Sequence, residues 1–191
     1  MTKNIQGYAI LENLLNGNKD FVNGELSILN HQVDTLKQLK NQQHPDAMIF
    51  TCSDSRISPE IIFNCGLGKL FTIKTAGLAI DDNVIETLEY GIEKLKIELL
   101  ILLGHDNCGA IETAKKYYPQ KGHFDSLVNG IYPVMTSATI STDDLAKTYT
   151  KSLENTLINK SDIIKTAIKD NNLLLIKAHL NHDTGIVEIL E

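Results

Sequence analysis

The chain has 191 residues, of which 42% are hydrophobic and 22% charged, and these proportions are typical of a globular protein with one compact domain. The formal net charge is -6 without a cluster of Lys and Arg, so a nucleic acid partner is not expected. The longest apolar run, at 99–103, is far shorter than the roughly 20 residues that a membrane-spanning helix needs, and the first residues lack a signal-peptide pattern. The composition predicts a cytoplasmic protein that does not bind membranes.

The first part of the chain, residues 1–44, is predicted to be an N-terminal helical arm in front of an α/β domain at 45–191. One amphipathic segment should end near Gly17, and a second should follow it. The two segments are marked by Tyr8, Leu11, Leu14 and Leu15, and by Leu26, Val33, Leu36 and Leu39. Such an arm packs either on another subunit or on its own sheet, and the apolar spacing fits both.

Short apolar runs alternate with helical patterns through the rest of the chain. Unbroken apolar runs are typical of strands that are buried on both faces of a parallel sheet. Strands are expected at 47–51, 70–74, 98–103 and 173–178, with a short last strand at 186–190. The predicted fold class is therefore α/β, with a mostly parallel central sheet of about four strands plus an antiparallel edge strand, flanked by helices.

Three helix starts can be read from capping residues. Ser58 before Pro59 is typical of the start of a short helix. Asp82 is expected to cap a longer helix, and Ser161 should start a new helix after the one that carries Leu145 and Leu157.

Two polar loops follow predicted strands and carry residues with metal chemistry. Cys52 follows the first strand, while His105 and Cys108 follow the third. Ligand sites of open α/β sheets form at the carboxyl ends of the strands, so the two loops meet if their strands are neighbours. Two thiolates and an imidazole are a zinc ligand set that leaves a fourth position for water. The alternative is that both cysteines are small buried hydrophobic residues and His105 is a satisfied loop histidine.

Asp54 and Arg56 alternate with Cys52, so an extended segment would place all three side chains on one side. A carboxylate beside a metal serves either as a fourth ligand or as a hydrogen-bond acceptor for bound water. Arg56 can hold Asp54 in a bidentate pair and keep it off the metal. The alternative is a surface ion pair of little consequence.

Two segments in this order and spacing resemble the signatures of the β-class carbonic anhydrases. The segment at 50–63 reads FTCSDSRISPEIIF, and the segment at 104–110 reads GHDNCGA. Gln43-His44-Pro45 and Asp183-Thr184-Gly185 are similar to further parts of that family. The chain departs from the family at 74–78, which read KTAGL in place of RNAGN, and at 177–180, which read KAHL where a Gly and a Tyr are usual.

The resemblance implies zinc-dependent, reversible hydration of carbon dioxide to bicarbonate and a proton, by attack of zinc-bound hydroxide on CO2. Each subunit would hold one Zn²⁺, and the chain would self-associate as a dimer or tetramer, which favours an arm that packs on another subunit. Cys52, His105 and Cys108 would bind zinc, and Asp54 and Arg56 would orient the hydroxide. Gln43 would hydrogen-bond the substrate, and the backbone of Gly109 would help to hold bicarbonate.

Two other functions remain open at this point. A hydrolase of carbonyl sulfide or carbon disulfide would use the same zinc geometry. A zinc-stabilised dimer without activity would result if Asp54 filled the fourth position permanently. Four histidines could relay the proton that the reaction releases, but each is predicted to be a solvated surface residue. These histidines are His44, His123, His179 and His182. Cys65 is predicted to be a packing residue inside the short helix.

Overall fold

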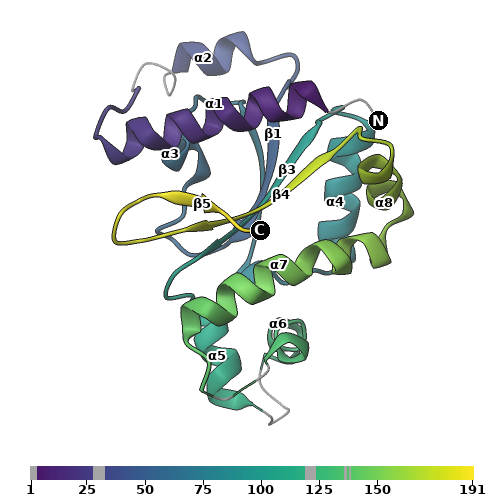
Figure 1. The fold of residues 1–191 in the computed structure, drawn as a ribbon. Coiled ribbons are helices and arrows are strands. Elements are labelled where there is room, and N and C mark those ends of the chain that lie inside the picture. Colours follow the sequence, from purple (N-terminus) through teal and green to yellow (C-terminus); the bar gives the residue numbers. More distant parts are fainter. Residues whose placement is uncertain (1–3, 28–32, 119–123, 136, 138) are drawn as a thin grey trace.

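The computed structural model describes residues 4–27, 33–118, 124–135, 137 and 139–191. Five strands form one sheet in the order β2-β1-β3-β4-β5, with parallel pairing except between β4 and β5 (Figure 1). The strands are β1 (Ala47–Cys52), β2 (Leu70–Thr75), β3 (Leu99–His105), β4 (Leu174–Leu180) and β5 (Val187–Ile189). The predicted fold class, with four parallel strands and an antiparallel edge strand, is confirmed.

Helices cover both faces of the sheet, which explains why the central strands are buried at every position and mostly apolar. Every residue of β1 and β3 is buried. Alternate residues of each strand belong to two different hydrophobic clusters: Met48 and Phe50 pack on one face, and Ala47 and Ile49 pack on the other. A strand that contributes to two cores has no solvent-facing side to carry polar residues.

The helices divide between the two faces, and one pair lies beyond the end of the sheet (Figure 1). On one face lie α1 (Ile5–Val22) and α3 (Pro59–Ile62). On the other face lie α4 (Asp82–Glu93), α7 (Thr142–Lys160) and α8 (Asp162–Lys169). Beyond the sheet lie α5 (Gly109–Tyr117) and α6 (Asp125–Val128), and the short elements are α2 (Val33–Gln38), η2 (Ala76–Leu78) and η3 (Tyr132–Val134).

The N-terminal helix packs on the chain's own sheet. Leu11 and Leu14 belong to the same hydrophobic cluster as the adjoining face of β1 and β3. The prediction that this helix ends near Gly17 is wrong, since the helix continues to Val22. Gly17 lies where a Cβ would collide with the carbonyl oxygen of Phe63. This glycine permits close packing of α1 on the end of α3 and does not end the helix. The second predicted segment is the short helix α2, none of whose residues is buried.

Apart from the end of α1, element boundaries differ from the predicted ones by one or two residues. The helix α4 is capped by Asp81 and not by Asp82, because the Asp81 carboxylate accepts the Val84 N–H at 2.9 Å. Ser161 caps α8 as predicted. The strands β3 and β4 continue to His105 and Leu180, since their parallel register extends to these residues. Within the described segments, the helices are too short or too polar to cross a bilayer.

Candidate metal centre

The parallel pairing of β1 with β3 brings the two predicted loops together at the carboxyl edge of the sheet. Thr51 lies beside Leu103 in this register, so Cys52 and His105 end neighbouring strands. Cys108 precedes the first residue of α5. The ligand atoms of the three predicted zinc ligands lie within 4.8 Å of one another, and all three residues are buried. The structure therefore places Cys52, His105 and Cys108 in one cluster with the composition of a metal site.

A tight turn between His105 and Cys108 makes this convergence possible. Asn107 has a φ of 50°, in the left-handed region that asparagine adopts more readily than most residues. Its N–H donates to the Asp143 carboxylate at 2.8 Å, and its carbonyl accepts from the Arg56 guanidinium at 3.2 Å. The turn is thus held from α7 on one side and from the Cys52 loop on the other.

The two thiols of the cluster differ in acidity. The hydrogen bond from Cys108 lowers the pKa of Cys52 to about 4 despite its burial, and contacts with His105 and the Gly77 N–H act in the same direction. The same bond and burial raise the pKa of Cys108, which retains the shared proton. The Gly77 N–H lies 3.3 Å from the Cys52 sulfur. Gly77 has a φ of 59° and lies where a Cβ would collide with Ala110, so glycine fits this position best.

The imidazole of His105 presents one nitrogen to the cluster. Its Nδ1 lies 2.8 Å from the Asp106 carbonyl oxygen, which can only accept, so Nδ1 carries the proton. Its Nε2 is buried and has no hydrogen-bond partner among the described residues. Burial, the largest single influence, opposes protonation of His105, but Cys52, the Asp106 carbonyl and Asp54 together outweigh burial and raise the pKa of His105. An unpartnered imidazole nitrogen facing two thiols fits Zn²⁺ and leaves a fourth coordination position for a small ligand.

Asp54 and Arg56 form the predicted bidentate pair beside this cluster. The Arg56 Nε and a terminal nitrogen donate to the two oxygens of Asp54 at 2.9 and 2.8 Å, and the Arg56 N–H donates to the same carboxylate at 2.9 Å. These bonds hold the pKa of Asp54 well below its usual range. Asp54 is therefore an anion at neutral pH, with both oxygens occupied by Arg56.

Lys74, one of the departures from the β-class pattern, supports the turn between Asp54 and Ile57 that carries Arg56. Its ammonium group donates to the carbonyl oxygens of Ile57 at 2.6 Å and Asp54 at 3.3 Å. The Ile57 N–H donates back to the Asp54 carbonyl at 3.1 Å. The turn that carries Arg56 is therefore closed from within and held by β2 from outside.

A small cavity of about 310 Å³ opens beside the cluster. Its polar wall includes Cys52, Asp54 and Gly109, the first residue of α5. The rest of its wall is built mainly of small or apolar residues, namely Ala76, Gly77, Ala110, Phe124 and Leu127. The cavity suits a small, weakly polar molecule.

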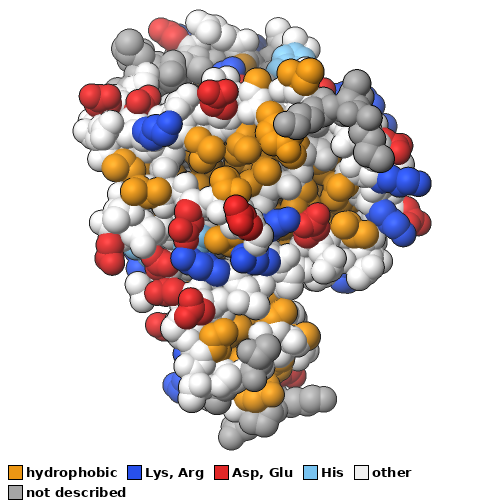
Figure 2. All heavy atoms as spheres, viewed as in Figure 1, with side chains coloured by type: hydrophobic (Ala, Val, Ile, Leu, Met, Phe, Trp, Pro, Cys, Tyr) orange, Lys and Arg blue, Asp and Glu red, His pale blue; other side chains and the backbone are white. Residues whose placement is uncertain are grey.

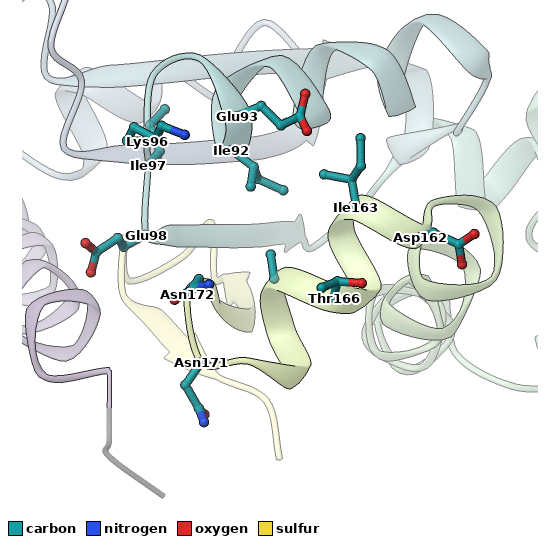
Figure 3. Close-up of a pocket in the computed structure, with 11 residues that line it drawn as sticks. Ile92, Glu93, Lys96, Ile97, Glu98, Asp162, Ile163, Thr166, Asn171 and Asn172 are labelled. Atoms are coloured by element: carbon teal, nitrogen blue, oxygen red, sulfur yellow. The ribbon is translucent and has the colours of Figure 1, made fainter.

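A larger cavity of about 630 Å³ lies elsewhere, between α4 and α8 at the amino-terminal edge of the sheet (Figure 3). Ile92 and Ile163 line it, and Glu98 and Asn172 lie where β3 and β4 begin. Its position at the far edge of the sheet separates it from Cys52, which ends β1 at the opposite edge.

The predicted substrate residue Gln43 does not join the cluster within this chain. It is exposed and precedes β1, whereas Cys52 ends that strand, so the two lie at opposite edges of the sheet. Gln43 is also not among the residues that line the 310 Å³ cavity. Its substrate-binding role stays a prediction.

The prediction of solvated surface histidines is wrong for two of the four. His179 is completely buried because it faces Gly104 across the parallel β3–β4 pair, and its Nε2 lies 2.7 Å from Asp106. His182 is half-buried, with its ring centroid 5.1 Å from that of His105. His44 is exposed as predicted, and His123 lies outside the described residues. The rule that ligand sites form at the carboxyl edge of a sheet also applies to the end of β4, and it points to His182 once β4 is known to lie beside β3.

Cys65 lies outside the cluster and packs against the hydrophobic cluster beneath α1, as predicted. It follows α3 and is not part of it, because that helix ends at Ile62. Burial raises the pKa of the Cys65 thiol to about 12.

Comparisons with known proteins agree with this geometry. The family model described as carbonic anhydrase matches residues 47–187. Carbonic anhydrase 2 of Mycobacterium tuberculosis is 41% identical over 111 residues, which are 58% of this chain and 54% of that protein. The Coccomyxa β-carbonic anhydrase solved with acetazolamide superposes with a TM-score of 0.72 at 25% identity, covering 82% of this chain and 78% of that one.

A tetrameric β-carbonic anhydrase from Sordaria macrospora shares the fold, with a TM-score of 0.70 at 20% identity over 81% of this chain and 85% of that one. The chain spans about half the length of the curated relatives that it matches. The match of the family model covers most of the chain and includes all three cluster residues. The resemblance found in the sequence is thus confirmed, and the chain belongs to the β-class carbonic anhydrase family.

Proposed function

We propose that the chain catalyses the reversible hydration of carbon dioxide to bicarbonate and a proton, with one Zn²⁺ held by Cys52, His105 and Cys108. The observation that carries this proposal is the buried cluster of two thiols and one unpartnered imidazole nitrogen, which adjoins a small cavity. A structural zinc site commonly has four protein ligands, whereas three ligands with an open position are typical of catalytic zinc.

The ion would supply a water molecule of lowered pKa, which adds to CO2 as hydroxide. The two oxygens of Asp54 accept hydrogen bonds from Arg56. The carboxylate would therefore be held off the fourth position of a bound ion, and it would accept a hydrogen bond from the nucleophile there. The Gly109 N–H lies at the start of α5, where helix N–H groups are unpaired and attract anions. Gly109 would accordingly help to hold bicarbonate before it leaves.

Self-association as a dimer or tetramer is part of the proposal. Figure 2 shows hydrophobic side chains gathered over the face on which β4 and β5 lie in Figure 1. Val22, Ile186 and Ile189 are among the large hydrophobic residues that are exposed in the single chain. Because Gln43 and Cys52 lie at opposite edges of one sheet, Gln43 would reach substrate only from a second copy. The cytoplasmic location stays a prediction from the sequence.

The proposal is tested by measuring CO2 hydration and zinc content together, on wild type, Cys108→Ala and the control Cys65→Ala. We expect about one zinc per wild-type chain and hydration well above the uncatalysed rate. Cys108→Ala should lose both properties because it removes a ligand, whereas Cys65→Ala should keep both because Cys65 lies outside the cluster.

Two outcomes would contradict the proposal. A zinc-loaded wild type without hydration activity would favour a structural site, with Asp54 in the fourth position. Faster turnover of carbonyl sulfide or carbon disulfide than of CO2, in parallel assays, would identify a hydrolase that uses the same cluster.

A further inference from the structure

A buried carboxylate–imidazole pair lies directly behind the proposed metal ligands. His179, on β4, is completely buried, and Asp106, which follows His105, is 8% exposed. The His179 Nε2 donates to the Asp106 carboxylate at 2.7 Å. Burial, the largest single influence, acts to raise the pKa of Asp106, but His179, the His182 N–H and Lys147 together outweigh burial and lower the pKa. Asp106 is therefore a buried anion whose side-chain partner is His179.

The remaining polar groups of Asp106 tie the loop to β4 and to His105. Its second carboxylate oxygen accepts the His182 N–H at 3.2 Å, and its own N–H donates to the Leu180 carbonyl at 3.2 Å. Its carbonyl oxygen accepts the His105 Nδ1–H at 2.8 Å. The side chain of Asp106 thus fixes its backbone, and the backbone fixes the ring of His105.

We propose that His179 and Asp106 are positioning residues for the metal ligand His105, which set its tautomer and its ring orientation. With the Asp106 carbonyl held in place, Nδ1 keeps the proton and Nε2 faces Cys52 and Cys108 as a lone-pair donor. This inference rests on the proposed function, because it assumes that the cluster binds zinc. It also gives a role to His179, which lies within the KAHL segment where the chain departs from the β-class pattern.

Removal of the donor should weaken the metal site. In His179→Leu, a side chain of similar size fills the space but removes the side-chain donor of the Asp106 carboxylate, which keeps only the His182 N–H. Groups that orient a metal ligand typically contribute about 10- to 100-fold to metal affinity, and this is the loss that we expect. His179→Gln, whose amide nitrogen can reach the position of Nε2, should retain most of the affinity.

The experiment measures zinc affinity of the full chain by competition with a chelator, for wild type, His179→Leu, His179→Gln and Lys177→Met. Lys177 is the matched control because it lies two residues earlier on the same face of β4 and donates to Glu154 at 2.6 Å. Lys177→Met should leave zinc affinity unchanged. Asp106→Asn, which loses the charge and keeps the shape, should weaken binding as His179→Leu does and serves if His179→Leu does not fold.

A second readout uses the zinc-free protein, in which nitrogen NMR distinguishes the two tautomers of His105. The Nδ1–H form should dominate in wild type and His179→Gln, and a mixture should appear in His179→Leu. Unchanged zinc affinity and tautomer in both His179→Leu and Asp106→Asn would overturn the inference and leave the proposed function intact. If the wild type binds no zinc, or if Cys108→Ala binds zinc as tightly as the wild type, the proposed function is overturned and this inference with it.

Discussion

At the scale of single residues, the Arg56 side chain connects the two loops of the candidate site. Its guanidinium binds both oxygens of Asp54 and also the carbonyl of Asn107, next to Cys108. Arg56 is the single arginine in the sequence, although the chain has 18 basic residues. A planar fork of donors suits this task, and the point charge of a lysine does not.

Arg56→Lys should therefore lower CO2 hydration while leaving zinc content unchanged. Loss of the bidentate pair frees Asp54 to move, and displacement of a positioned group by about 1 Å costs on the order of 100-fold in rate. Hydration assays and metal analysis of the same samples test this expectation. Activity within a few-fold of wild type would show that Asp54 does not depend on Arg56.

The thiols of the zinc-free protein should react in a definite order. Cys52 lines the 310 Å³ cavity, and its pKa is lowered to about 4, so it is a thiolate at pH 6. Burial raises the pKa of Cys65 to about 12, so Cys65 stays a thiol at this pH. The thiolate is the nucleophile, so iodoacetamide at pH 6 should modify Cys52 first.

Zinc added before the reagent should protect Cys52 from iodoacetamide, and mass spectrometry of peptides would identify the modified residue. Modification of Cys65 before Cys52, or the same rate at Cys52 with and without zinc, would contradict the assignment of the cluster.

The site residues could be predicted well from the sequence because their motifs are local and the edge of a parallel sheet is a reliable meeting point. Cys52, His105 and Cys108 meet as predicted, and Asp54 pairs with Arg56. The contact between Asp106 and His179 could not be predicted from the sequence. The two residues lie 73 positions apart, and their contact depends on the register of β3 with β4.

At the scale of secondary-structure elements, α1 shows why a glycine can be misread. In isolation Gly17 indicates a helix end, but it lies inside α1 where the helix backbone touches the carbonyl of Phe63. A contact 46 residues away along the chain leaves no mark on local periodicity. The starts of α3 and α8 were predictable because the signals lie next to them in sequence, namely Pro59 at the first position of α3 and Ser161 as the cap of α8.

Gly17→Ala should destabilise the protein, even though alanine is more favourable than glycine inside a helix by about 1 kcal/mol. The added methyl group would collide with the Phe63 carbonyl, and such overpacking costs about 1–3 kcal/mol. Asn13→Ala is the control, because Asn13 is exposed on the same helix and should gain a few tenths of a kcal/mol. Urea unfolding measures both variants, and a more stable Gly17→Ala would show that α1 does not pack this closely.

At the scale of the whole molecule, the order of strands brings three strand ends to one edge. The alternation of strands and helices predicts a parallel sheet, and the observed order places β3 between β1 and β4. The residues that end or follow these strands, Cys52, His105 and His182, consequently share one region. The sequence alone does not specify which strands are neighbours, so the third contribution to the site was not predicted.

The pH dependence of global stability should reveal the buried imidazole. Burial lowers the pKa of His179 in the folded chain, although the bond to Asp106 opposes this shift. As pH falls through about 6.5, the ordinary value for histidine, the unfolded state binds a proton that the folded state accepts less readily. The free energy of unfolding of the zinc-free protein should therefore decrease on acidification, as urea titrations between pH 8 and pH 5.5 would show.

The matched comparison for this prediction is His179→Gln, which has no titratable group at this position. Its unfolding free energy should depend less on pH than that of wild type over the same range. Equal slopes for the two proteins would show that His179 does not titrate differently on folding.

The central claim is that Cys52, His105 and Cys108 hold one metal ion whose fourth position is open. The absorption spectrum of the cobalt-substituted protein, recorded with and without bicarbonate, tests it most directly. The account predicts thiolate-to-cobalt absorption together with the visible bands of a tetrahedral ion, and these bands should shift when bicarbonate is added. Absence of thiolate absorption, or a tetrahedral spectrum that bicarbonate leaves unchanged, would contradict it.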